Sequence, residues 1–234
     1  MRLLPGSPGT RNSVVMETPM LNSGKDNLSR RDLLHKAFAL GGITVVSSFS
    51  AGSLMEAWAA QAQQTRKLTP PNDLGPFYKK RAPENPNMRD PRDPGLPLAV
   101  SGGVYNEKGE ILHDATVEVW HTDHLGHYDL EGYRYRAKLH PNAKGKYAFN
   151  SVIPGHYPDR VCQHIHYLVT APGHKPLITQ LYFATDPVFE ANPDKNFTRD
   201  PLIHTRELVR PVMLTGDPKD VLAAVQFELV LAKA

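Results

Sequence analysis

From residue 97 onward, hydrophobic and polar residues alternate in short segments, and clusters of Gly, Pro and Asn separate these segments. Alternation at this spacing is typical of β-strands joined by turns. In the segment 115–120, Val117 and Val119 should lie on one face and Glu118 and Trp120 on the other. We therefore expect an all-β fold, an antiparallel β-sandwich with long loops. The pattern predicts strands at residues 97–105, 115–120, 146–150, 164–170, 177–184 and 225–231.

Two segments lack this alternation. Residues 65–97 are rich in proline and charged residues, and their one apolar island is the stretch Leu-Gly-Pro-Phe-Tyr at 74–78. We expect them to form an irregular N-terminal arm that lies over the sandwich. Residues 186–201 show little hydrophobic periodicity, and we expect them to form a long loop.

The first 62 residues have a different character. Arg30 and Arg31 precede an apolar run at 37–55, and Ala-x-Ala sites follow at 57–62. This order resembles a twin-arginine signal peptide with a peptidase site. The alternative is an ordinary helix with two basic residues, but the Gly, Ser and Thr residues after position 40 would make a poor globular helix. The pattern predicts a cleaved signal at 1–62, a mature domain at 63–234, recognition by the twin-arginine export machinery, and a periplasmic or extracellular location.

Charge and cysteine content limit the classes of partner. Six of the 27 Lys and Arg residues and four of the 24 acidic residues lie in the predicted signal, which leaves a mature net charge of about +1. A basic surface for nucleic acid or anionic lipid is therefore not expected. No later stretch is apolar enough to span a bilayer, so we expect no stable membrane insertion after cleavage. Cys162 is the only cysteine, which excludes an intrachain disulfide.

His164 and His166 are the strongest candidates for metal ligands. In an extended strand, residues i and i+2 point to the same face, so the two imidazoles can converge on one ion. Tyr128 and Tyr157 lie beside turns that can direct a phenol toward the end of a sandwich. From the residues alone, alternatives remain open. The tyrosines can instead cap backbone carbonyls, and the histidines can instead belong to a zinc hydrolase, although no third His or carboxylate ligand stands at the usual spacing.

These residues belong to a longer series of motifs that resembles the intradiol ring-cleavage dioxygenases, the family of protocatechuate and catechol dioxygenases. The series covers about 110 residues in the family's order. The resemblance implies that residues 63–234 form a catalytic domain. The motifs are, in chain order, Leu74 to Tyr78, Ala115 to Trp120, Gly126 to Tyr128, Pro154 to Pro158, His164 to His166 and Thr179 to Phe183.

The resemblance also implies a non-haem ferric ion, Fe(III), held by two tyrosines and two histidines. Tyr128 and His166 would be the equatorial ligands, and Tyr157 and His164 the axial ones. Two phenolates are hard anionic donors that favour Fe(III). Only a strong Lewis acid would hold both as phenolates at neutral pH, because a free tyrosine has a pKa near 10.

Other tyrosines fit the ligand positions less well. Tyr133 and Tyr135 are rivals for the first position, but the family's tyrosine follows a Gly-x pair, as Tyr128 does after Gly126. The remaining tyrosines are predicted to be packing residues: Tyr78, Tyr105, Tyr147, Tyr167 and Tyr182.

Arg160 and Gln180 are the residues that the resemblance places on the substrate. Arg160 would stabilise charge on the ring and Gln180 would help to position it, while Tyr157 would leave the metal and accept a substrate proton. Arg160 stands four residues before His164, whereas the family usually has three. The alternative role for Arg160 is therefore a surface ion pair with Asp159.

The implied reaction opens the ring of a catechol-type substrate between its two hydroxyl-bearing carbons with O2 and yields a cis,cis-muconate-type diacid. A protocatechuate-like substrate is favoured, because the chain lacks the long helical region of the family's catechol dioxygenases and carries Arg134, Arg136 and Arg160 near the proposed mouth. A non-catalytic transthyretin-like binding module is the alternative, because residues 102–120 also resemble the hairpin of such sandwiches. The number of subunits stays open, a homo-oligomer included.

Overall fold

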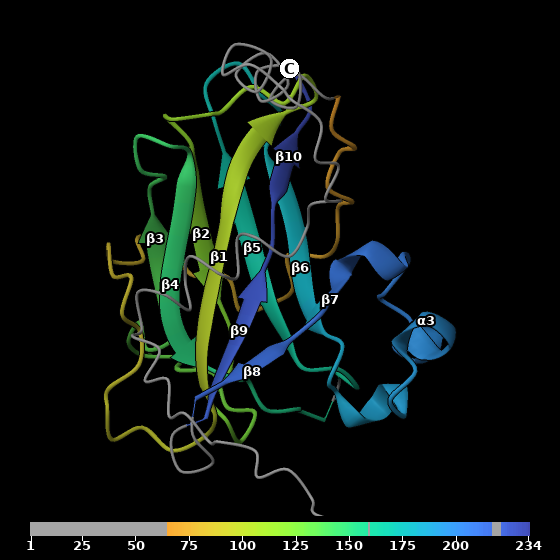
Figure 1. Ribbon diagram of the computed structural model, residues 1–234. Coiled ribbons are helices and arrows are strands. Elements are labelled where there is room, and N and C mark those ends of the chain that lie inside the picture. The colour runs from red at the N-terminus through yellow and green to blue at the C-terminus, as the bar shows by residue number, and fades with distance from the viewer. Residues whose placement is uncertain (1–64, 159, 217–220) are drawn as a thin grey trace, which may run out of the picture. The chain divides into compact units, whose positions relative to one another are not determined.

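Two β-sheets form the main part of the protein (Figure 1). The computed structural model describes residues 65–158, 160–216 and 221–234, and the predicted signal at 1–62 lies outside them. In the first sheet the strand order is β10-β1-β9-β8, with β4 on the other edge of β1, and in the second it is β3-β2-β5-β6-β7. Side chains from both sheets share one hydrophobic core, so the predicted all-β sandwich is confirmed.

The strands are short, as the alternation predicted. The first sheet consists of β1 (Pro97–Asn106), β4 (Lys146–Val152), β8 (Met213–Thr215), β9 (Leu222–Gln226) and β10 (Leu229–Leu231). The second consists of β2 (Thr116–Trp120), β3 (Arg136–Leu139), β5 (His164–Thr170), β6 (Leu177–Phe183) and β7 (Val209–Arg210).

The strand pairing differs from the expected antiparallel arrangement in three places. The pairs β1·β9, β1·β10 and β6·β7 are parallel. A long connection precedes β7, which can therefore enter its sheet in either direction, whereas β9 and β10 are separated by only two residues and run in the same direction along β1. The predicted strand at 225–231 is also divided, because the Phe227 carbonyl accepts a hydrogen bond from the Tyr147 hydroxyl at 2.6 Å.

The two faces of the second sheet have different roles. Val117 and Val119 are buried in the core between the sheets, as predicted. Directly opposed residues share a face of a sheet, and the register aligns Arg136, Trp120, His166 and Gln180 across β3, β2, β5 and β6. This row lies on the outer face, yet Trp120 is only 2% exposed. The outer face must therefore be covered.

The predicted N-terminal arm supplies this cover. The Asp73 carbonyl accepts a hydrogen bond from Gln180 Nε2 at 2.7 Å, and the Phe77 carbonyl accepts one from Arg136 Nη1 at 2.5 Å. Gly75, with φ of +69°, lies so close to His166 that a Cβ would stand 2.9 Å from the imidazole Cε1. The arm thus crosses the sheet from β6 to β3 and closes over the histidine.

The segment after β6 carries most of the helical turns. These are η1 (Pro187–Phe189), α3 (Pro193–Asn196), η2 (Phe197–Arg199) and η3 (Arg206–Leu208). They account for the predicted lack of strand pattern at 186–201. Within the described ranges, no helix is long and apolar enough to cross a membrane.

Candidate functional site

Four aromatic side chains meet at one end of the second sheet. Ring centroids are 5.7 Å apart for Tyr128 and Tyr157, 5.6 Å for Tyr157 and His164, and 4.8 Å for His164 and His166. Phe77 of the arm stacks on Tyr128 at 4.3 Å. The four residues proposed as ligands are thus brought together from two loops and one strand.

A tight contact between loops places the two tyrosines. Gly126 has φ of +90°, and a Cβ at this position would lie 1.8 Å from the His156 carbonyl oxygen. Only glycine allows the loop before Tyr128 to pack against the loop that carries Tyr157. The Gly-x-Tyr spacing therefore has a steric reason in this chain.

Backbone carbonyls orient both imidazoles. His164 Nδ1 lies 2.7 Å from the Cys162 carbonyl oxygen, and His166 Nδ1 lies 3.3 Å from that of Asp73. Because a carbonyl only accepts, each Nδ1 must carry the proton and donate it. Each Nε2 then presents a lone pair, which is the arrangement found in metal-binding histidines.

Both Nε2 lone pairs lie in a buried environment. His166 Nε2 is buried and makes no hydrogen bond to the described part of the chain. Burial, helped by the Arg160 cation, lowers the pKa of His164 to about 3, and burial together with His164 and Arg160 lowers that of His166 well below 6.5. Both rings are therefore neutral at pH 7 and able to coordinate a cation.

The hydroxyl of Tyr128 is buried, and two cations lie near this residue. Burial and the neighbouring Tyr157 raise the pKa of Tyr128, whereas Arg160 and Arg136 lower it. The guanidinium carbon of Arg136 lies 5.5 Å from the ring centroid. The phenol stays protonated at neutral pH unless a cation binds its oxygen directly. Two neutral imidazoles and two phenols fit a ferric ion, which suits hard oxygen donors alongside nitrogen.

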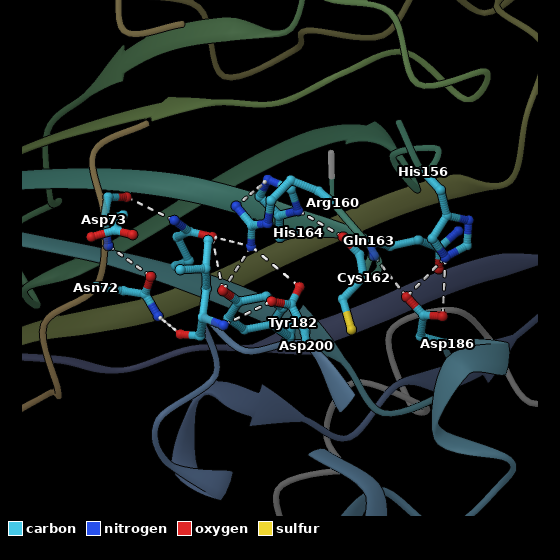
Figure 2. A network of polar contacts seen from close by, with 12 residues as sticks. Asn72, Asp73, His156, Arg160, Cys162, Gln163, His164, Tyr182, Asp186 and Asp200 are labelled. Carbon is cyan, nitrogen blue, oxygen red and sulfur yellow. Dashed lines mark hydrogen bonds and ion pairs between the residues drawn. The ribbon is translucent and has the colours of Figure 1, made fainter. Parts of the chain in front are cut away.

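Arg160 lies beside His164 within a polar network (Figure 2), and it is hydrogen-bonded to Gln180. Arg160 is 8% exposed, so the alternative of a surface arginine is wrong. Its Nη2 donates to Gln180 Oε1 and to the Tyr182 hydroxyl, both at 2.9 Å, and its Nη1 lies 3.2 Å from His164 Nε2. A hydrogen bond from the Arg160 amide to the Tyr157 carbonyl at 2.9 Å holds the segment, despite the extra residue before His164.

Sequence reasoning missed two members of this network. Tyr182 was predicted only to pack, yet its hydroxyl donates to Gln180 Oε1 at 2.9 Å. Asp200, which is 1% exposed, pairs with Arg160 Nη2 at 3.5 Å. The alternation that placed Gln180 on the outer face also places Tyr182 there, and this signal could have identified it. No local pattern marks Asp200.

The competing candidates have other partners. The Tyr133 hydroxyl donates to the Lys80 carbonyl at 3.0 Å, and the Tyr135 hydroxyl donates to Asp93 at 3.0 Å. In the parts of the chain that the structure covers, no group of three or more His, Cys, Asp or Glu side chains is arranged to hold a metal ion. The side chains beside the pair His164 and His166 that could supply oxygen donors include the phenols of Tyr128 and Tyr157.

The fold agrees with comparisons to known proteins. Residues 74–233 match the model of the family described as Dioxygenase. Catechol 1,2-dioxygenase 2 of Acinetobacter lwoffii is 34% identical over 148 residues, which are 51% of this chain and 52% of that protein. Hydroxyquinol 1,2-dioxygenase of Corynebacterium glutamicum is 28% identical over 215 residues, or 80% of this chain and 71% of the relative. The chain belongs to the intradiol ring-cleavage dioxygenase family.

Solved structures give the same family. The dioxygenase domain of a dioxygenase and carbohydrate-binding protein fusion from Streptomyces sp. SirexAA-E superposes with a TM-score of 0.62 at 31% identity, covering 72% of this chain and 100% of that domain. Catechol 1,2-dioxygenase from Acinetobacter sp. ADP1 shares the fold, with a TM-score of 0.61 at 24% identity, over 88% of this chain and 80% of that one. The chain spans about half the length of the Acinetobacter lwoffii relative.

Proposed function

We propose that the protein is a non-haem Fe(III) intradiol dioxygenase, which opens the ring of a catechol-type substrate with O2 and incorporates both oxygen atoms into a cis,cis-muconate-type diacid. The observation that carries the proposal is the convergence of two neutral imidazoles, fixed by carbonyls, on two tyrosines. Tyr128, Tyr157, His164 and His166 would hold the metal. The dioxygenase relatives support this chemistry.

Ferric iron, when bound, would supply the Lewis acidity that holds phenols as phenolates and draws electron density from the substrate ring toward reaction with O2. Tyr157 would accept a proton from a substrate hydroxyl at its Oη. Arg160 would stabilise negative charge on the ring through its guanidinium. Gln180 would act mainly by holding Arg160, since both ends of its amide are already hydrogen-bonded.

The substrate is proposed to be a substituted catechol, with protocatechuate favoured. Two buried guanidiniums, those of Arg136 and Arg160, lie at the tyrosine and histidine cluster and would favour an anionic substituent. Arg134 adds nothing to this argument, because it pairs with Asp93 at 2.5 Å. The relatives are named for catechol and hydroxyquinol, so these two compounds are the necessary competitors in any assay.

Export is a separate proposal. Arg30 and Arg31, the apolar run after them and the Ala-x-Ala sites support removal of residues 1–62 by way of the twin-arginine route. The mature enzyme would then act in the periplasm or outside the cell.

The decisive experiment measures metal and product together. Iron-loaded protein should contain about one iron per chain, show the visible absorption of phenolate-to-iron charge transfer, and consume one O2 for each substrate opened. Protocatechuate, catechol and hydroxyquinol should be compared, with the product identified by mass. A semialdehyde product would contradict intradiol cleavage. Colourless protein with stoichiometric zinc would contradict the iron site, and inactivity of iron-loaded protein toward all three compounds would favour a binding module.

A further inference from the structure

Asp200 is a buried carboxylate that the proposed chemistry does not use. It follows η2 and lies under the segment that leads into β5, as Figure 2 shows. Its Oδ1 accepts a hydrogen bond from the Leu202 amide at 2.9 Å, and its Oδ2 lies 3.5 Å from Arg160 Nη2. A buried carboxylate at 1% exposure is costly unless it is paired. Its partner is the arginine proposed to face the substrate.

The two terminal nitrogens of Arg160 have different surroundings. Nη2 is surrounded by three oxygens, those of Gln180, Tyr182 and Asp200. Nη1 instead donates to His164 Nε2, the lone pair that a metal ion would need. When a metal takes that lone pair, Nη1 loses its acceptor and the three contacts of Nη2 remain. The guanidinium then stays in place with N–H groups free at the site.

Charge gives a second reason for the pair. An uncompensated guanidinium beside His164 would repel a ferric ion and would itself be expensive to bury. Of the three side chains whose oxygens surround Nη2, only Asp200 carries a formal charge, because the side chains of Gln180 and Tyr182 are neutral. We propose that Asp200 is a positioning residue that orients and partly neutralises Arg160, so that Nη1 is presented to the substrate once the metal is bound. This inference rests on the proposed function.

Asp186 offers a matched control. It is also 1% exposed and lies at the start of the same segment, but it holds the Gln163 amide at 2.6 Å and His156 at 3.1 Å. No hydrogen bond or ion pair joins it to Arg160 among the described residues. Asp186→Asn therefore disturbs the segment without removing the counter-charge of the arginine.

The test on iron-loaded enzyme is a double-mutant cycle. Asp200→Asn alone should lower kcat about tenfold at nearly unchanged iron content and shift the charge-transfer band of the substrate complex. In a protein that already carries Arg160→Gln, the same change should lower kcat little further. Asp200→Glu, which keeps the charge, should retain most of the wild-type kcat. Asp186→Asn should combine additively with Arg160→Gln. Additive effects of Asp200→Asn and Arg160→Gln, or wild-type kcat in Asp200→Asn, would overturn the proposal.

A second measurement needs neither metal nor activity. In a crystal structure of metal-free Asp200→Asn protein, Arg160 should leave Gln180 and Tyr182 or occupy several conformers, whereas an unmoved Arg160 would overturn the proposal. If the Asn variant does not fold, Asp200→Ser replaces it, since a hydroxyl can still accept from the Leu202 amide. If the wild-type protein lacks iron and activity, the proposed function fails. The crystal structure of the metal-free Asp200→Asn protein still decides whether Asp200 positions Arg160.

Discussion

The imidazole of His166 lies flat against the indole of Trp120, with 5.0 Å between ring centroids and 4° between planes. Gly75 of the arm closes the approach to the imidazole Cε1. The ring is therefore held by an aromatic surface and by a backbone segment distant in sequence, while its Nε2 remains without a hydrogen bond to the described residues. Such confinement holds the proposed ligand His166 in one orientation without a bound ion.

The first prediction concerns Gly75. Gly75→Ala should displace the arm or tilt His166, because the new Cβ would meet the ring at 2.9 Å and φ is +69°. We expect iron affinity to fall about tenfold, as for other changes that disturb ligand orientation. Competition with a chelator measures this. Asp73→Ala is the control, since Asp73 contributes only its carbonyl, and an equal loss there would refute the steric explanation.

The two tyrosine ligands should respond differently to substitution. Tyr128→Phe should lose iron, because Tyr128 is proposed to be a ligand that remains bound throughout the reaction. Tyr157→Phe should retain more iron and lose turnover, because its oxygen is proposed to leave the metal and accept a proton. Metal analysis and O2 uptake distinguish these outcomes. Identical behaviour of the two variants would show that the axial assignment of Tyr157 is wrong.

His121 should make the fold sensitive to acid. Its ring is 1% exposed and lies 2.8 Å from Ser151 Oγ, and burial lowers the pKa of His121 to about 4. The unfolded chain takes up the proton below about pH 6.5, so stability is full above that pH and is lost as pH falls toward 4. Lowering the pH from 7 to 5 should therefore reduce the free energy of unfolding by about 2 kcal/mol through this group.

Urea unfolding of metal-free protein at the two pH values measures the effect of His121. His121→Asn should reduce the pH dependence by that amount, whereas His204→Asn, at an exposed position, should leave it unchanged. An equal pH dependence in wild type and His121→Asn would disprove the role assigned to the buried ring.

Export should depend on the arginine pair. Arg30→Lys with Arg31→Lys should keep the longer precursor inside the cell, because the twin-arginine route requires the pair. Fractionation and the mass of the exported form measure this, and the mature form should begin near Ala60 or Gln63. Unchanged export of the double variant would exclude the route.

The alternation of hydrophobic and polar residues was sufficient to place side chains on strand faces where residues close in sequence are also close in space. The i, i+2 spacing of His164 and His166 places both on one face of β5, and the alternation around Val117 identified the core side of β2. By contrast, β3 was not predicted, since Arg136–Leu139 is only four residues long and its two apolar side chains are each preceded by a cation. Its arginine is buried only because the arm covers it.

The rest of the site depends on contacts that no local pattern encodes. The carbonyl that orients His166 comes from Asp73, and the carboxylate beside Arg160 comes from Asp200. Backbone acceptors have no sequence signature, and an aspartate in a loop is most often solvated. The unusual spacing from Arg160 to His164 left a surface position open as the alternative, and the fold shows the arginine to be buried.

The arm holds the outer face of the sheet largely through main-chain oxygens, those of Asp73 and Phe77. Every amino acid carries such an oxygen, so identity matters little at position 73, whereas the count of residues between the two carbonyls matters greatly. Inserting or deleting one residue at 74–76 would misalign one of them with Gln180 or Arg136. Variation in this segment is therefore constrained in length more than in composition, and libraries that aim at new substrates can randomise position 73 if they keep the spacing and Gly75.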